Sequence, residues 1–184
     1  MPEITLEQLV ENLRAETELL FGAALNEWNY IGVEFRDGGP CLLYYYATGN
    51  IAISLSNHVV NDNRQLIFQL AHEVCHLLHP SKRLNNTSES KTTVLNEGIS
   101  TYFQIKKMED FFGLGKETIE SIKELNPNYY DAYILVNTLV CQDRESIKKL
   151  RNKKPRIDEL ELQDFKILNF KIDDCIKNKL TSSF

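Results

Sequence analysis

The sequence has no long hydrophobic run and no basic leader segment. Its apolar stretches, such as IFQLAHEVCHLL from Ile67, are interrupted by polar residues and fall short of the roughly 18 residues that a membrane-spanning helix needs. The first residues, MPEITLEQ, carry acidic groups and lack the basic flank of a signal peptide. We therefore expect no membrane association and a cytosolic, cytoplasmic location.

An excess of positive charge is also missing. The chain holds 21 Lys and Arg against 26 Asp and Glu, a formal net charge of -5. Binding to phosphate backbones depends largely on clustered Lys and Arg. The composition therefore predicts no nucleic-acid partner.

Closely spaced cysteine pairs are absent as well. The four cysteines, Cys41, Cys75, Cys141 and Cys175, are widely spaced and form no CxxC motif. Their apolar or helical surroundings predict buried free thiols rather than disulfides.

The 184 residues, with 42% hydrophobic and 26% charged side chains, suit one globular domain spanning 1–184. Helical periodicity begins behind a Thr5/Gln8 capping-box pair and continues to about residue 25. Segments 29–35, 41–48 and 51–55 are rich in β-branched and aromatic residues and predict an antiparallel meander. Further helices are predicted over residues 63–78, 92–108, 116–125, 128–140 and 143–152. The expected fold class is α+β, mostly helical.

The segment HEVCH places His72 and His76 four residues apart, with Glu73 between them. Residues at this spacing share one side of a helix and lie about 6 Å apart along its axis. The two imidazoles can therefore converge on one zinc ion, and Glu73 stands beside it as the base for a water molecule. Apolar neighbours predict a largely buried helix, where each unpartnered ring would cost roughly 1 to 3 kcal/mol.

A third ligand is offered by Glu97, which follows His76 by 21 residues in VLNEGISTYF. This arrangement resembles the gluzincins, in which a glutamate about twenty residues downstream completes a His-His-Glu zinc site. The Asn96-Glu97-Gly98 core and Tyr102 resemble the Asn-Glu-Gly-x-x-x-Tyr stretch of aminopeptidase N-type enzymes and related small domains.

The resemblance implies a zincin-like fold with Zn²⁺ held by His72, His76 and Glu97, and with Glu73 as general base. It covers residues 65–103, and more weakly YYDAYILVNTL. Two departures are present. No Gly-x-Met-Glu-Asn segment is found to bind a substrate's amino end, which favours endopeptidase action. The aspartate that follows the ligand glutamate in thermolysin-like enzymes is replaced by Thr101, so we expect a hydroxyl or backbone carbonyl to orient the metal-bound histidine.

Several tyrosines are candidates for stabilising the oxyanion formed during hydrolysis. Tyr130 and Tyr133 lead, ahead of Tyr102 and Tyr129, because they lie in the segment resembling the tyrosine-bearing helix of such families. Aromatic residues at helical spacing equally suit a core position.

Two further histidines invite attention. His79 shares the azimuth of His72 and His76, but three ligands in line along one helix cannot surround a tetrahedral ion. We expect His79 to be a helix-end group favoured by the helix dipole. His58 follows the last predicted strand and is expected in a loop, with substrate contact as the alternative.

Two functions fit the motif. The favoured one is a zinc metallopeptidase acting on a peptide or protein, with the substrate backbone pairing to an edge strand at Ile51 to Leu55. The alternative is a non-enzymatic or regulatory metal-stabilised domain that binds a partner protein, as in phage- and plasmid-related proteins with such a helix. An intact Glu73 favours chemistry, because a purely structural zinc site gains nothing from that carboxylate.

Overall fold

The computed structural model describes residues 4–85 and 92–184 of the chain. Its strands are β1 (Asn29–Arg36), β2 (Cys41–Tyr45) and β3 (Asn50–Ser56). Its α-helices are α1 (Leu6–Phe21), α2 (Asn63–Leu78), α3 (Val94–Phe112), α4 (Gly115–Leu125), α5 (Pro127–Gln142), α6 (Ser146–Lys153), α7 (Leu162–Ile167) and α8 (Asp174–Thr181). Short 3-10 turns cover Asn57–Val59 and Ile157–Glu159. The α+β class is confirmed.

Helix α1 begins with the capping box predicted from the sequence. The Thr5 N–H donates to Gln8 Oε1 at 2.9 Å, and the Gln8 N–H donates to Thr5 Oγ1 at 3.2 Å. These two bonds satisfy amide groups that have no partner within the helix. The buried face of α1 packs on α2.

The three strands form a mixed sheet in the order β1-β3-β2. Strands β2 and β3 are an antiparallel hairpin, as predicted, but β1 runs parallel to β3, with Asn29 opposite Asn50. The prediction of an antiparallel meander was therefore wrong for β1. The reason lies in β3, which is buried from Ile51 to Ser56 and takes the central place, where a strand is covered most fully.

This strand order also corrects the predicted substrate edge. Residues Ile51 to Leu55 lie in the centre of the sheet, so their backbone groups are already paired on both sides. Within the described residues, the edges of the sheet are β1 and β2. An added peptide strand can pair only with one of these two.

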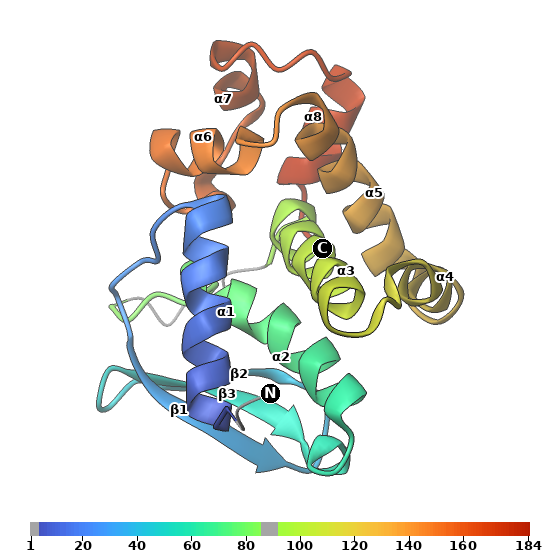
Figure 1. The fold of residues 1–184 in the computed structure, drawn as a ribbon. Coiled ribbons are helices and arrows are strands. Elements are labelled where there is room, and N and C mark those ends of the chain that lie inside the picture. Colours follow the sequence, from blue (N-terminus) through green and yellow to red (C-terminus); the bar gives the residue numbers. More distant parts are fainter. Residues whose placement is uncertain (1–3, 86–91) are drawn as a thin grey trace.

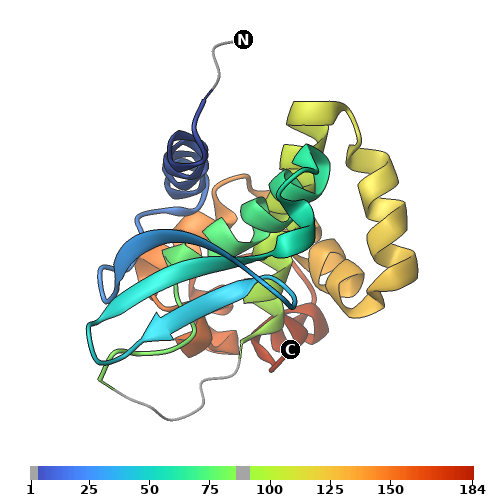
Figure 2. The same cartoon turned by 90° about the horizontal axis from the view of Figure 1, so that it is seen from below.

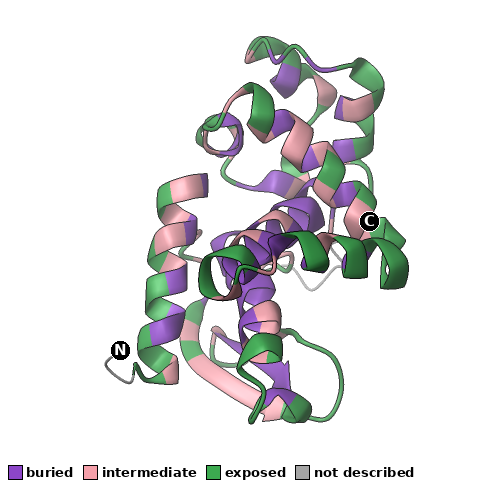
Figure 3. Ribbon diagram, turned by 45° about the vertical axis from the view of Figure 1, so that its right-hand side comes forward, coloured by how far each residue is buried: buried purple, intermediate pink, exposed green. Residues whose placement is uncertain are grey.

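Helix α2 lies in the middle of the molecule, between the sheet and α3 (Figure 1). Seen from below, the strands form one layer with the helices behind them (Figure 2). Burial concentrates along α2 and the first half of α3 (Figure 3), where α3 is buried without interruption from Val94 to Thr101. The two helices that carry the predicted metal ligands therefore form the centre of the fold.

Close approach of α3 and α5 depends on Gly98. A Cβ atom at this position would lie 2.5 Å from the Ala132 carbonyl oxygen and 2.6 Å from Val136 Cγ2. Only glycine lets the backbones come so near without displacement. The contact brings the first turn of α5 towards the start of α3, which matters for the site described below.

The cysteines only partly follow the prediction. All four are free thiols, but only Cys75 is buried, while Cys41, Cys141 and Cys175 are exposed. Cys41 lies on an edge strand, and Cys141 and Cys175 occupy exposed positions of helices whose other residues, such as Leu139 and Leu180, supply the core. Among the described helices, none combines the length and apolar character needed to cross a membrane.

Candidate metal centre

Three side chains predicted as ligands converge in the structure. His72 and His76 project from α2, and Glu97 projects from the first turn of α3; their possible ligand atoms all lie within 4.8 Å of one another. Glu97 Oε2 is 3.1 Å from His72 Nε2 and 3.5 Å from His76 Nε2. Donor atoms about 2.0 to 2.2 Å from a tetrahedral ion are about 3.3 to 3.6 Å apart. The group can therefore hold one metal ion.

The two helix starts place these ligands. Asp62 caps α2 by accepting hydrogen bonds from the amides of Arg64 and Gln65, at 3.0 and 3.1 Å. Thr93 caps α3 by accepting from the Asn96 amide at 3.2 Å. Glu97 then falls in the first turn of α3, where the helix dipole favours a negative charge.

Neighbouring side chains orient the ligands. Asn96 Oδ1 lies 3.1 Å from His76 Nδ1, so a proton on Nδ1 leaves Nε2 free to bind a metal. The Thr92 hydroxyl donates to Glu97 Oε1 at 2.8 Å, which leaves Oε2 facing the histidines. A hydroxyl or backbone carbonyl was expected to orient a histidine, but the group beside His76 is the side-chain oxygen of Asn96. The Thr101 hydroxyl donates to the backbone carbonyl of Glu97 at 2.8 Å.

Sequence reasoning missed both orienting roles. The sequence offers Asn96 as part of the Asn-Glu-Gly resemblance, and its place beside Glu97 in the same helix turn is a usable signal. Thr92 lies outside α3, and no helical spacing links it to Glu97.

Electrostatic coupling ties the histidine and glutamate together. Burial alone would lower the pKa of His76, but the carboxylates of Glu97 and Glu73 and the contact with Asn96 outweigh it and raise that pKa to about 9. Burial would raise the pKa of Glu97, but the neighbouring His76 and His72 outweigh it and lower that pKa. In the metal-free protein a proton is thus held between these side chains, and a metal ion must displace it.

Glu73 stands beside the ligands without belonging to their group. Its side chain is buried, and burial raises its pKa, although His76 and His72 partly offset this effect. A carboxylate with raised proton affinity is a better proton acceptor near neutral pH.

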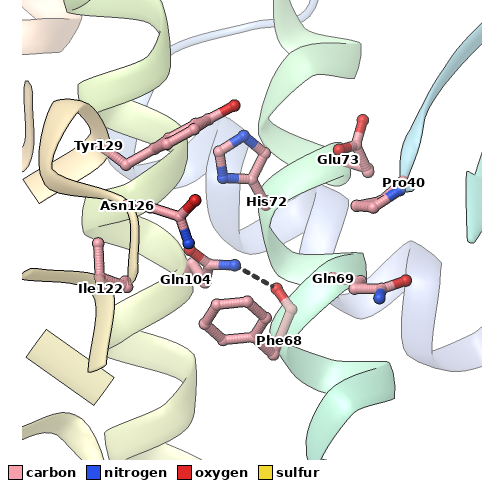
Figure 4. A pocket seen from close by; sticks show the side chains of 9 residues that line it. All are labelled: Pro40, Phe68, Gln69, His72, Glu73, Gln104, Ile122, Asn126 and Tyr129. Carbon is pink, nitrogen blue, oxygen red and sulfur yellow. Dashed lines mark hydrogen bonds between the residues drawn. The ribbon is translucent and has the colours of Figure 1, made fainter. Parts of the chain in front are cut away.

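Two cavities meet at this group. One, of about 260 Å³, is bounded by His72, Glu73 and Tyr129 along one edge and by Phe68 and Ile122 further in (Figure 4). The other, of about 270 Å³, contains the three possible ligands and is bounded on its far side by β2. Glu73 borders both cavities.

The tyrosine beside the site is Tyr129. Its ring centre is 5.7 Å from that of His72, in an edge-on arrangement, and it lines both cavities. Tyr130 and Tyr133, the two preferred from sequence, line neither cavity; Tyr133 stacks on Tyr102 at 6.4 Å instead. The register of α5, which begins at Pro127, turns Tyr129 towards α2 and carries the next tyrosine away.

His79 and His58 lie outside the ligand group. His79 is buried at the end of α2, and its ring nitrogens have no hydrogen-bond partner among the described residues. Burial, together with the charges of Arg151 and His76, holds its pKa well below the usual value. His79 is therefore neutral, rather than the charged helix-end group that was expected. His58 is exposed in a 3-10 turn and lines neither of the two cavities.

Comparisons with known proteins give no match: the chain matches no protein-family model, no curated protein and no solved structure. The likeness to gluzincins therefore rests on motif spacing and on the geometry of this site. Both point to the same residues, His72, His76 and Glu97.

Proposed function

We propose that the protein is a zinc-dependent hydrolase that cuts internal peptide bonds. The convergence of His72, His76 and Glu97 carries this proposal. Two imidazoles and one carboxylate are a donor set that zinc favours, and three protein ligands leave a fourth position open, as in catalytic zinc sites. Zinc bound there would polarise a substrate carbonyl and acidify a water molecule.

Glu73 is the general base of the proposed reaction. It borders both cavities and lies next to the ligands. Its carboxylate would accept the proton of the attacking water and then deliver that proton to the nitrogen of the leaving amine. A metal site that served only to stabilise the fold would have no use for a carboxylate at this place.

Tyr129 takes the role that sequence reasoning gave to Tyr130 and Tyr133. Burial, followed by the charges of Glu97 and Glu73, raises the pKa of its phenol, so the hydroxyl keeps its proton at neutral pH. A protonated hydroxyl at the cavity edge can donate a hydrogen bond to a carbonyl oxygen as negative charge develops on it.

An extended peptide would bind along β2. This strand is an edge of the sheet, and Cys41, Leu42 and Tyr44 border the cavity that contains the metal ligands. Pairing with a free strand edge supplies backbone hydrogen bonds for any sequence. The neighbouring cavity, with Phe68, Ile122 and the amide of Gln104, suits an uncharged substrate side chain.

Peptides blocked at both ends test this proposal. Zinc-loaded protein should cut acetylated and amidated peptides at internal bonds, lose this activity when a chelator removes the metal, and regain it when zinc is restored. Cleavage of unblocked peptides only would show that the enzyme needs a free terminus and is not an endopeptidase. If zinc-loaded protein cuts no peptide or protein, the alternative function is favoured, a metal-stabilised domain that binds a partner protein.

A further inference from the structure

The segment 182–184 is paired with the residues that lead into α3. The Val94 N–H donates to the Ser182 carbonyl at 3.0 Å, and the Phe184 N–H donates to the Thr92 carbonyl at 3.0 Å. Between these two bonds, Thr93 and Ser183 form an isolated antiparallel bridge. Three residues from the far end of the sequence thus fix the backbone immediately before Glu97.

The side chain of Phe184 reaches the other half of the site. Its ring centre lies 4.8 Å from that of Tyr129, and the Tyr129 ring lies 5.7 Å from that of His72. A continuous series of ring contacts therefore runs from the segment to a metal ligand.

We propose that segment 182–184 is a strap that positions the metal centre. Its backbone holds Thr92, whose hydroxyl fixes Glu97, and its Phe184 ring holds Tyr129 against His72. Thr92 and Phe184 are positioning residues, since neither belongs to the ligand group. The strap rests on the metal site of the proposed function and is independent of whether that site cleaves peptides.

The strap is needed because the hydrogen bonds of α3 do not fix the Thr92 backbone, and those of α5 do not fix the Tyr129 ring. Thr92 precedes α3, which begins at Val94, so the hydrogen bonds within the helix do not fix its carbonyl. That carbonyl accepts a hydrogen bond from the Phe184 N–H. The Tyr129 ring contacts the rings of His72 and Phe184, and these two contacts restrict where it lies.

Zinc affinity is the measurement that responds to positioning, because groups that orient metal ligands typically contribute about 10- to 100-fold to it. Affinity can be measured by competition with a chromophoric chelator, beside thermal unfolding of the metal-free protein. Phe184→Ala should weaken zinc binding about 10-fold, and Phe184→Tyr, which keeps the ring, should bind as wild type does. Thr92→Val should also lose about 10-fold, while Thr92→Ser keeps the hydroxyl and the affinity.

Phe111→Ala is the matched control. Phe111 is 46% exposed and Phe184 39% exposed, but Phe111 lies near the opposite end of α3, far along the chain from Glu97. Its removal should leave zinc affinity unchanged. A Phe184→Ala protein that binds zinc as tightly as Phe111→Ala would overturn the strap.

A double-mutant cycle tests the route of the effect. If Phe184 acts through Tyr129, its truncation should weaken zinc binding clearly less in a Tyr129→Ala background than in wild type. An equal loss in both backgrounds would overturn the positioning role of Phe184. A wild type that binds no zinc would overturn both the strap and the proposed function. If zinc binding follows these predictions but no peptide is cleaved, only the proposed peptidase activity is refuted.

Discussion

Helix α2 and the residue that ends it show two different histidine environments. On the cavity face of the helix, His72 and His76 border cavities and contact Glu97 and Asn96. Directly after the last turn, His79 lies in the core without a hydrogen-bond partner among the described residues. The same type of side chain is thus a candidate ligand in one place and a core group in the other.

The charges facing α2 explain the difference. Glu73 and Glu97 give the cavity face a surplus of negative charge that a metal cation can neutralise. The C-terminal end of α2 meets Arg151, whose guanidinium donates to the backbone carbonyls of Phe21, Gly22, Ala23 and Leu78. Burial lowers the pKa of Arg151 to about 10, but it stays charged, and its charge disfavours any further cation beside His79. Facing groups, rather than residue type, decide which histidines can bind metal.

The largest expected effect is loss of metal from the cavity face alone. Purified wild type should contain about one zinc per chain, and His72→Ala, His76→Ala or Glu97→Ala should abolish it, because each removes a ligand. His79→Ala should keep its zinc. Elemental analysis measures the content. Zinc retained in Glu97→Ala and lost in His79→Ala would reverse the comparison and rule out a gluzincin-like site.

A strong pH dependence should accompany zinc binding. His76 must be neutral to bind zinc, and its pKa in the metal-free protein is raised to about 9. Below that value a proton competes with the metal, so zinc affinity should rise about 10-fold per pH unit and level off above about pH 9. Chelator competition at several pH values measures this trend. An affinity that stays constant from roughly pH 6.5 to 8.5 would show that no proton is displaced.

A smaller effect is expected at the C-terminal end of α2. Arg151→Met should lower the free energy of unfolding by about 3 kcal/mol or more, because buried carbonyls of two helix ends lose their donor. Zinc content should not change, since Arg151 touches no ligand. Urea denaturation measures the loss, and Lys149→Met removes an exposed cation of the same helix as a control. Loss of zinc in folded Arg151→Met protein would show that the metal site depends on the contacts at the end of α2.

The convergence of His72, His76 and Glu97 could be predicted from the sequence because the geometry is local. His72 and His76 are brought together by the period of one helix, which four residues of spacing already define. Glu97 needed only a second helix whose first turn faces the first one. Such local relations can be predicted without knowledge of the remaining fold.

The sequence could not show relations between distant segments. Strand order depends on which strand is most completely covered, so the spacing of segments 29–35, 41–48 and 51–55 could not show that β3 is central. Tyr129 faces His72 because α5 starts at Pro127 and approaches α3 closely at Gly98. A tyrosine chosen by resemblance within YYDAYILVNTL could not take that register into account.

The central claim, that the cavity face of α2 performs hydrolysis, is tested most directly by comparing zinc-loaded wild type with zinc-loaded Glu73→Gln on one blocked peptide. Glutamine keeps the size of the side chain but cannot accept the proton. We predict equal zinc content, an unchanged fold and a cleavage rate lowered by about 10²- to 10⁴-fold. Equal cleavage by both forms, or no cleavage by either with full zinc occupancy, would contradict the account.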